Sequence, residues 1–456
     1  MEISVAGAGA GKTTTMADRV VSASELTEAH QNIYCLAFTN NAVSRIEEKL
    51  LEYYDELPLN IKVSTLHSFL YQEIIKPYYF LLYKKQYEYV SSIDLPEKAA
   101  FKSKKISELD SKGIIHVSVI PQHAMWVVVK KSSDKKREKA IREKVLKTLV
   151  QYCGKIFIDE AQDIDNNILE VFRAFDTIGI PIELIGDPKQ DLRSHGSFRS
   201  LVTEREAGIT FLSVCHRCPQ QHLKISNALI PDAEKQKSEK IEGTVEIVFE
   251  SNIQVLKFLE KSSFDLAYIS ERNKRFETHA NEKVTKSFET LMYEIEGILG
   301  SREPLANKNV LASRAYYIAY RMSRDIEAGL TPSAMIRTYL GRLDRLQYAK
   351  VISALQKSNE RAKNIPIVST IESIKGQEGN SCLFILTTDL AVYLFGEKTV
   401  ENKTKNKLYV ALTRSLNALT ILVTQEVENK YGADYIQNYV SMLLSSLNKS
   451  IQKHNN

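Results

Sequence analysis

A short segment rich in glycine and alanine near the start limits the folds open to this chain. The apolar residues Ile3-Ser4-Val5 are typical of a buried strand, and they lead directly into Ala6-Gly7-Ala8-Gly9-Ala10-Gly11-Lys12-Thr13. This is the phosphate-binding loop pattern with Ala at its first glycine position, and a helical segment follows it. Small residues let successive backbone N–H groups surround an anion, and the helix dipole favours negative charge there. The pattern predicts a nucleoside triphosphate site; a plain Gly/Ala-rich turn is the alternative.

The residue types in this loop predict separate roles. Lys12 can reach the β- and γ-phosphates, and the Thr13 hydroxyl can bind Mg²⁺. The loop residues expected to contact the nucleotide are Ala8, Gly9, Ala10, Gly11, Lys12, Thr13 and Thr14.

Apolar strands alternate with helical segments in the first part of the chain and again after residue 150. The strands expected there are 3–6, 33–37, 61–65, 155–158 and 181–185. Such alternation predicts an α/β fold with a parallel sheet covered by helices on both faces. A second α/β unit is expected from strands at 245–250, 266–269, 367–370, 383–386 and 419–424.

Two segments lack the alternation and are expected to be mostly helical insertions. Residues 71–149 form the first, which is rich in Tyr and Lys, and residues 285–360 form the second. The second insertion contains Tyr316, Tyr317 and Tyr320, which are interpreted as core residues, with ligand binding as the alternative.

Acidic residues follow two of the predicted strands. Asp159-Glu160 comes after 155–158, and Gly186-Asp187 comes after 181–185. Because ligands of open parallel sheets bind beyond the carboxyl ends of the strands, these acids are expected beside the phosphate-binding loop. Asp159 is expected to bind Mg²⁺ together with Thr13, and Glu160 to orient the attacking water.

Positive charge is concentrated in one segment of the chain. The 456 residues carry a formal net charge of +5, yet 130–147 alone holds nine Lys/Arg and three Asp/Glu residues. That run predicts either a solvated helix face or a phosphate-contacting surface, and both remain open.

Five cysteines, no long apolar run and a strand at the very start favour a cytoplasmic protein without a signal peptide. Cys215 and Cys218 have metal-site spacing, but without a second ligand pair they are interpreted as core residues.

Several motifs occur in an order that resembles the UvrD/Rep-like helicases of superfamily 1A. These are Phe38-Thr39-Asn40-Asn41-Ala42, Thr65-Leu66-His67-Ser68-Phe69, Asp159-Glu160-Ala161-Gln162-Asp163, Gly186-Asp187-Pro188-Lys189-Gln190, His216-Arg217, Lys375-Gly376-Gln377-Glu378 and Tyr409-Val410-Ala411-Leu412-Thr413-Arg414. The resemblance covers essentially the whole chain. It implies two RecA-like domains, 1–70 with 150–212 and 213–284 with 361–456, interrupted by the insertions 71–149 and 285–360.

The resemblance also implies roles for individual residues. Glu160, Gln190, Arg217 and Arg414 would be catalytic; Glu378 would contact the ATP ribose. Single-stranded DNA would be contacted by Phe38, Thr39, Asn40, His67 and Lys375. Two arginines that reach phosphate bound on the other domain would stabilise the charge developing in phosphoryl transfer.

The chain departs from the family pattern in four places. In the family, a segment before the loop carries a glutamine that recognises adenine. No such segment precedes the loop in this sequence, so selectivity for ATP over other nucleoside triphosphates is left open. Asp191-Leu192-Arg193-Ser194-His195-Gly196-Ser197 has no aromatic ring for base stacking apart from His195, and Glu372 stands where the family has His. Both insertions are short for a processive helicase. The missing aromatic rings predict a weaker grip on single strands.

The compact layout is most similar to the helicase-like subunits of bacterial Gabija anti-phage defence systems. This resemblance implies a nuclease partner and DNA, single-stranded or with ends, as the ligand. Two functions stay open: a DNA-stimulated ATPase and 3′–5′ helicase or translocase, and a nucleotide-dependent DNA-end sensor that activates a nuclease with little unwinding. A small-molecule kinase is disfavoured by the paired acids and the distant arginines.

Overall fold

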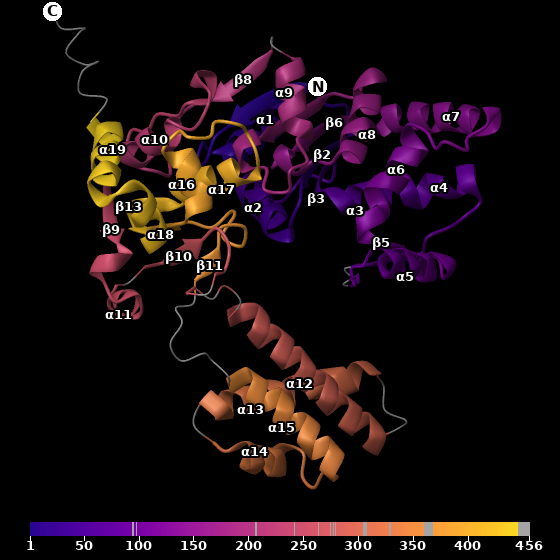
Figure 1. Ribbon diagram of the computed structural model, residues 1–456. Coiled ribbons are helices and arrows are strands. Elements are labelled where there is room, and N and C mark those ends of the chain that lie inside the picture. Colours follow the sequence, from indigo (N-terminus) through magenta and orange to yellow (C-terminus); the bar gives the residue numbers. More distant parts are fainter. Residues whose placement is uncertain are drawn as a thin grey trace, which may run out of the picture. The chain divides into compact units, whose positions relative to one another are not determined.

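The structure is a computed structural model that describes most of the chain. The described residues are 1–93, 95–96, 98–205, 208–240, 242–262, 264–273, 275–276, 278, 280–303, 308–327, 330–359 and 368–445. They divide into two compact units, Met1–Phe249 with Lys375–Asn456, and Glu250–Ile374 (Figure 1). The expected strand residue Ile367 and the expected domain boundary at 360/361 lie outside the described residues. The four-part domain division stays a prediction.

The first unit contains a six-stranded sheet whose strand pairs are all parallel. Its order is β3-β2-β6-β7-β1-β8. The strands are β1 (Glu2–Ala6), β2 (Asn32–Ala37), β3 (Ile61–Thr65), β6 (Cys153–Ile158), β7 (Ile182–Gly186) and β8 (Ile209–Leu212). The predicted α/β class is confirmed. Strand β8 was not predicted, because it is a short edge strand that is only partly buried.

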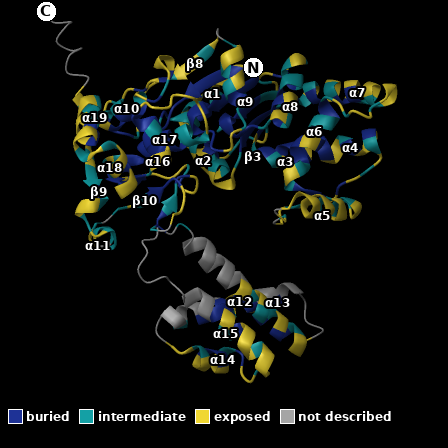
Figure 2. Cartoon of the chain, viewed as in Figure 1, coloured by how far each residue is buried: buried dark blue, intermediate teal, exposed yellow. Residues whose placement is uncertain are grey.

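Helices cover both faces of this sheet. Successive side chains of a strand point to opposite faces, so Leu36 packs into one core while its neighbours Cys35 and Ala37 pack into the other. Helices α1 (Lys12–Ser24) and α2 (Asn40–Leu51) line one face, and α8 (Asn166–Thr177) lines the other. Figure 2 shows the strands as the most buried layer. A sheet buried on both sides explains why these strands are almost entirely apolar.

Residues 66–152 lie between β3 and β6 and are mostly helical. The helices are α3 (Leu66–Phe69), α4 (Lys76–Tyr83), α5 (Ala99–Ser111), α6 (Ile120–Val128) and α7 (Lys136–Tyr152), with a π-helical turn at Leu70–Ile75. Two strands of three residues, β4 (Tyr89–Ser91) and β5 (Ile114–His116), pair in parallel. Strands this short carry no visible alternation, so the sequence analysis missed them.

Three further strands of the first unit pair in parallel, in the order β12-β13-β9. They are β9 (Thr244–Phe249), β12 (Gly379–Leu386) and β13 (Ser415–Val423). The associated helices are α9 (Ser197–Glu204), α10 (Gln220–Asn227), α16 (Thr388–Leu394), α17 (Lys403–Leu412), α18 (Gln425–Tyr431) and α19 (Ala433–Ser445). Both β12 and β13 begin four residues before the predicted strands, because half-exposed residues precede their apolar parts.

The second unit contains a parallel strand pair and a group of helices with its own core. Its elements are α11 (Val255–Lys261), β10 (Leu266–Ile269), α12 (Ala280–Arg302), α13 (Lys308–Glu327), α14 (Pro332–Tyr339), α15 (Arg345–Asn359) and β11 (Ser369–Thr370). None of the helices in the described part of the chain combines the length and apolar character needed to cross a membrane.

The interpretation of the α13 tyrosines as core residues is wrong for the two that are described. Tyr316 is 55% exposed and Tyr317 is 60% exposed. The residues of α13 that enter the core recur at helical spacing and are Leu311, Ala315, Ala319 and Met322. Their stripe turns the adjacent positions towards solvent. The side chain of Tyr320 lies outside the described part.

Candidate active site

Three of the motifs meet at one edge of the six-stranded sheet. The phosphate-binding loop follows β1, Asp159-Glu160 follows β6, and Asp187 follows β7. Strand β7 lies between β6 and β1, and all three are parallel. Their carboxyl ends therefore point the same way, which brings the loop and the acids together.

The loop owes its shape to two glycines. Gly9 has φ 69° and Gly11 has φ 71°, in the left-handed region that glycine adopts without steric cost. The Ala10 N–H donates to the Gly7 carbonyl at 3.2 Å, which closes the turn. Helix α1 then starts at Lys12, with Gly11 as its N-cap. The N–H groups at this helix start are the type of donor that binds phosphate.

Thr13 and Asp159, the two predicted metal ligands, are in contact. The Thr13 hydroxyl donates to Asp159 Oδ2 at 3.1 Å, and Asp159 is 3% exposed. Among the described residues, no group of three or more His, Cys, Asp or Glu side chains could hold a metal ion. Mg²⁺ does not require such a cage, because it commonly binds one or two protein oxygens and completes its octahedron with phosphate and water. The Thr–Asp pair fits that mode of binding.

The pKa values of the two adjacent acids are shifted in opposite directions. Burial raises the pKa of Asp159 to about 6, and the neighbouring Glu160 carboxylate adds to the effect, while Lys12 opposes it. Burial also acts to raise the pKa of Glu160, but the Lys12 and Lys375 ammonium groups and Gln162 hold it below its ordinary value. Glu160 is therefore an anion at neutral pH, as a residue that orients a water molecule must be.

Glu160 is held in an unusual backbone conformation. Its φ of 54° lies in the left-handed region, which non-glycine residues adopt at a cost of about 1–3 kcal/mol. Gln162 donates from Nε2 to the Glu160 carboxylate and accepts at Oε1 from the Asp187 N–H at 2.9 Å. It thus ties the end of β6 to the end of β7. The sequence analysis quoted Gln162 within its motif but assigned it no role.

Gln190 lies in a buried network centred on Asp187. The Gln190 amide donates to Asp187 Oδ2 at 2.9 Å, and Lys189 lies 2.8 Å from Asp187 Oδ1. Lys189 also contacts Glu234 at 2.7 Å, and Arg199 pairs with the same carboxylate. Glu234 belongs to no recognised motif, so nothing in the sequence pointed to it. Gln190 is thus positioned by Asp187, whose other carboxylate oxygen is held by Lys189.

Arg217 lies against the phosphate-binding loop. A Cβ atom added at Gly9 would lie 2.3 Å from the Arg217 Cβ, so only glycine leaves room for this approach. The Arg217 guanidinium donates from Nε to the Glu378 carboxylate at 2.6 Å. The structure therefore brings together the predicted arginine, the predicted ribose-binding acid and the loop.

Arg414 and Lys375 have partners other than the loop. Arg414 is fully buried and donates to the Val410 carbonyl at 3.0 Å and to the Gln377 carbonyl at 3.3 Å. Lys375 lies 2.8 Å from both carboxylate oxygens of Asp163. In this structure the Arg414 guanidinium is thus occupied by backbone carbonyls.

Ala8 in the loop is held by two side chains that the sequence analysis missed. The Ala8 N–H donates to the Tyr409 hydroxyl at 3.1 Å, and its carbonyl accepts from Gln236 Nε2 at 3.1 Å. The Tyr409 hydroxyl donates in turn to Gln236 Oε1 at 3.1 Å, which closes a ring of hydrogen bonds. Tyr409 stands in a quoted motif, whereas Gln236 has no sequence signal.

The Cys215–Cys218 pair packs beside the same loop. All five cysteines are free and buried, so their interpretation as core residues is confirmed. The Cys215 thiol donates to the Ala8 carbonyl at 3.1 Å. Contact with the Cys218 thiol and nearby backbone N–H groups lowers the pKa of Cys215 to about 6 despite its burial.

The residues predicted to contact DNA, apart from Lys375, gather at the ends of two neighbouring strands. Strands β2 and β3 pair with Ala37 opposite Thr65, so Phe38-Thr39-Asn40 and His67 follow at the same edge. Thr39 caps α2 by accepting the Ala42 N–H, and Asn40 is exposed. Phe38 is half-buried, and burial lowers the pKa of His67, which keeps its ring neutral at pH 7.

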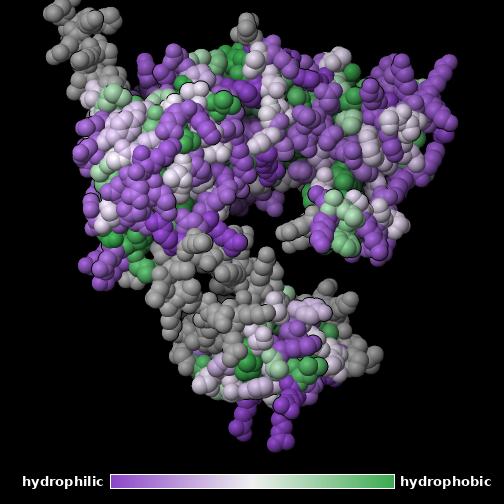
Figure 3. All heavy atoms as spheres, in the orientation of Figure 1, coloured by the Kyte–Doolittle hydropathy of each residue, from purple (hydrophilic) through white to green (hydrophobic). Residues whose placement is uncertain are grey.

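The basic run 130–147 is mostly on the surface. Its exposed basic residues are Lys130, Lys135, Lys136, Arg137, Lys139, Lys144 and Lys147. Figure 3 shows hydrophilic residues gathered over α7. Lys131 is half-buried, and Arg142 is buried, pairs with Asp134 and donates to the Val127 carbonyl. One of the nine basic residues therefore holds the fold together rather than facing solvent.

Comparison with known proteins places this geometry in context. Residues 2–196, which include the loop, Asp159, Glu160 and Asp187, match the model of a family described as an AAA domain. The chain is 23% identical to the Gabija protein GajB of Bacillus cereus strain VD045, over 98% of this chain and 97% of that protein. The similarity to a Gabija protein that the sequence predicts is therefore found over nearly the whole chain.

A solved structure is also similar in part. It is the arterivirus nonstructural protein 10 helicase in complex with DNA, with 11% identity, a TM-score of 0.37 and coverage of 92% of this chain. The chain spans 59% of that helicase's length. The sequence matches show similarity to an AAA domain over 2–196 and to a Gabija protein over nearly the whole chain.

Proposed function

We propose that this chain is an ATP hydrolase that moves along or unwinds DNA. The observation that carries the proposal is the Thr13–Asp159 contact at the phosphate-binding loop, with Glu160 next to it and Arg217 packed on Gly9. A 3′–5′ direction is taken from the family resemblance. We place the working domains as the sequence analysis did, with RecA-like parts at 1–70 with 150–212 and at 213–284 with 361–456.

Each residue of the site has a role in this proposal. The loop N–H groups and Lys12 bind the triphosphate, Glu160 orients the attacking water, and Gln190 senses the γ-phosphate. Thr13 and Asp159 would hold Mg²⁺, which neutralises charge on the β- and γ-phosphate oxygens when bound. Arg217 and Arg414 stabilise the charge of the transition state, and Glu378 contacts the ribose once Arg217 leaves it.

The biological setting is also a proposal. The similarity to a Gabija protein over nearly the whole chain supports a cytoplasmic role in anti-phage defence together with a nuclease subunit. The DNA ligand is a single strand or an end, contacted by Phe38, Thr39, Asn40, His67 and Lys375. The surface lysines of α7 supply additional phosphate contacts.

DNA-stimulated hydrolysis is the first expected result. Purified protein should hydrolyse ATP faster when single-stranded DNA is added. In this proposal, DNA bound at the carboxyl ends of β2 and β3 favours an arrangement in which Arg217 and Arg414 both contact the phosphates of ATP. Phosphate release with and without DNA measures this, and Lys12→Ala, which loses the β/γ-phosphate contact, is the blank. Hydrolysis that ignores single-stranded DNA entirely would refute a coupled motor.

A nucleotide-dependent DNA-end sensor is the second candidate. It is favoured by residues 191–197, where His195 is the only ring available for base stacking. Each stacked base contributes about 1–3 kcal/mol, so the loss weakens the hold on a single strand. A strand-displacement assay separates the two functions. Robust unwinding by the isolated chain would count against the sensor, whereas stimulated hydrolysis without unwinding would favour it.

DNA affinity is expected to fall with salt if α7 contacts phosphates. Each contact to a single strand contributes about 0.7 to the slope of log affinity against log salt concentration. The double variant Lys136→Ala/Lys139→Ala should lower the slope by about 1.4 if both residues contact phosphates. Fluorescence anisotropy of labelled DNA at several salt concentrations measures it, with the exposed Lys398→Ala as control. An unchanged slope would assign α7 to a solvated face.

A further inference from the structure

The segment between β3 and β6 encloses a cavity that is separate from the candidate active site. Its volume is about 470 Å³, within the range of about 300–1,000 Å³ that is usual for small-ligand sites. Its lining comes from α4, α5, β5, α6 and the turns beside them, from Tyr79 to Lys131. No residue of the phosphate-binding loop or of the acidic motifs takes part. The cavity therefore needs its own explanation.

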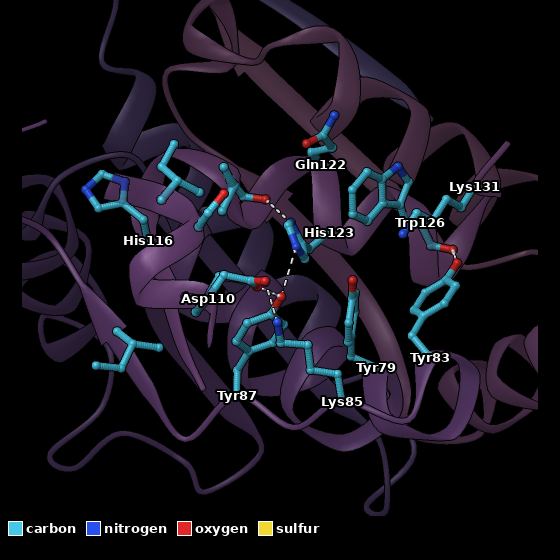
Figure 4. Close-up of a pocket in the computed structure, with 15 residues that line it drawn as sticks. Tyr79, Tyr83, Lys85, Tyr87, Asp110, His116, Gln122, His123, Trp126 and Lys131 are labelled. Carbon is cyan, nitrogen blue, oxygen red and sulfur yellow. Dashed lines mark hydrogen bonds and ion pairs between the residues drawn. The ribbon is translucent and has the colours of Figure 1, made fainter. Parts of the chain in front are cut away.

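Aromatic rings form its inner wall. In Figure 4, Tyr79, Tyr87, His123 and Trp126 surround the space. The His123 and Trp126 rings are 4.6 Å apart, and Tyr79 lies 5.3 Å from both His123 and Tyr87. A wall of this kind offers several flat faces to a planar ligand.

Buried hydrogen bonds hold the inner wall rigid. The Tyr87 hydroxyl donates to Asp110 Oδ1 at 2.6 Å and lies 3.2 Å from His123 Nε2. His123 Nδ1 lies 2.9 Å from the Val119 carbonyl, and burial lowers the pKa of His123, which keeps the ring neutral at pH 7. Tyr79, Tyr87 and His123 are each less than a tenth exposed. The rings are thus positioned before any ligand arrives, which lowers the entropic cost of binding.

The rim differs from the wall because it is partly exposed and positively charged. The Lys131 ammonium lies 4.3 Å from the centre of the Trp126 ring and 5.2 Å from that of Tyr83. Within the described part of the chain, Lys131 has no carboxylate partner, whereas Lys85 is paired with Asp110. The rim therefore keeps one positive charge that no neighbouring acid neutralises.

A buried ion pair holds this rim in place. Asp134 accepts the Lys131 backbone N–H at 2.6 Å and the Tyr83 hydroxyl at 3.2 Å. Arg142 of α7 pairs with Asp134 and donates to the Trp126 carbonyl at 2.9 Å. The Lys131 and Trp126 backbone and the Tyr83 hydroxyl are thus all bonded to one charged pair. This explains why one basic residue of the 130–147 run is buried.

Flat aromatic faces beside an uncompensated cation are complementary to a nucleotide. Any nucleobase can stack on an aromatic ring, because every base has a flat π-face. A lysine binds the phosphate of the nucleotide as a point charge. We propose that this cavity binds a nucleotide unit, with the base on the Trp126 face that Lys131 now covers and the phosphate on Lys131. Gln122, whose side chain is exposed at the rim, can offer both a donor and an acceptor to the base edge. The unit is either a free nucleotide or one nucleotide of a strand.

Trp126 provides a direct test, because it is the only tryptophan of the chain. The full chain carrying Lys12→Ala, which removes the triphosphate contact, is titrated with adenosine monophosphate and separately with a short oligothymidine. Saturable quenching of Trp126 fluorescence is expected with at least one probe. Quenching by the mononucleotide identifies a free-nucleotide site, and quenching by the oligonucleotide alone identifies a site for a strand.

Two further variants guard against an indirect effect. Adding Lys131→Ala should weaken the binding that quenches Trp126 by about tenfold, equivalent to about 1.4 kcal/mol. The matched control Lys398→Ala removes the same charge from an exposed position outside this segment and should leave the affinity unchanged. Absence of saturable quenching by both probes would overturn the proposal. So would equal affinities in the Lys131→Ala and Lys398→Ala proteins.

Discussion

Replacing Glu160 with glutamine is expected to lower ATP turnover by about 100- to 10,000-fold and to leave ATP binding nearly unchanged. The substitution keeps the size of the side chain but removes the negative charge that Lys12 and Lys375 stabilise at neutral pH. A neutral amide cannot polarise the attacking water in the same way. Binding should persist because the triphosphate contacts come from the loop N–H groups and Lys12, which the substitution does not touch.

Single-turnover hydrolysis and the affinity for a fluorescent ATP analogue test the two halves of this expectation. Glu204→Gln is a suitable control, because Glu204 is an exposed acid on α9 of the same unit. A Glu160→Gln protein that binds ATP weakly but turns it over at the normal rate would refute the role given to Glu160. Equal loss of both would indicate that the substitution disturbs the Gln162 contact and the loop geometry instead.

Much of the first sheet could be predicted because its strands are buried on both faces. Such strands are continuous apolar runs, so 33–37 was recognised within a residue of β2. The edge strand β8 and the short pair β4 and β5 escaped, because half-exposed or three-residue strands have no such signature. The helical spacing around Tyr316 was recognised, but spacing alone does not tell which face is buried.

Some contacts of the candidate site could be predicted from motifs and strand order, whereas others join residues far apart in the chain and could not. Thr13 and Asp159 could be paired in advance, because parallel strands place their carboxyl ends at one edge. The contacts of Ala8 with Gln236 and Tyr409 span 228 and 401 residues and follow no spacing rule. Their existence depends on how two sheets of one unit pack, which periodicity does not encode. The same holds for Glu234 beside Lys189.

Replacing Arg217 with alanine is the second change with a large expected effect. An arginine that contacts the transferred phosphoryl group contributes about 1,000- to 100,000-fold to turnover. The Arg217 Cβ lies against Gly9, so the side chain starts beside the loop and its guanidinium needs only to exchange Glu378 for phosphate. We expect Arg217→Ala to lower kcat by about 1,000-fold while ATP affinity changes far less, because the contact forms mainly as charge develops.

Comparison with Arg414 sharpens this test. Arg414 is buried and bonded to backbone carbonyls, so Arg414→Ala should lower the melting temperature as well as turnover. Arg217 is partly exposed, and its variant should melt like the parent protein. Arg217→Lys keeps the charge but loses the planar fork, so it should recover only part of the rate. An Arg217→Ala protein with normal kcat would instead make the Arg217–Glu378 pair a structural contact, and the search for the catalytic arginine would turn to Arg414 released from its carbonyls.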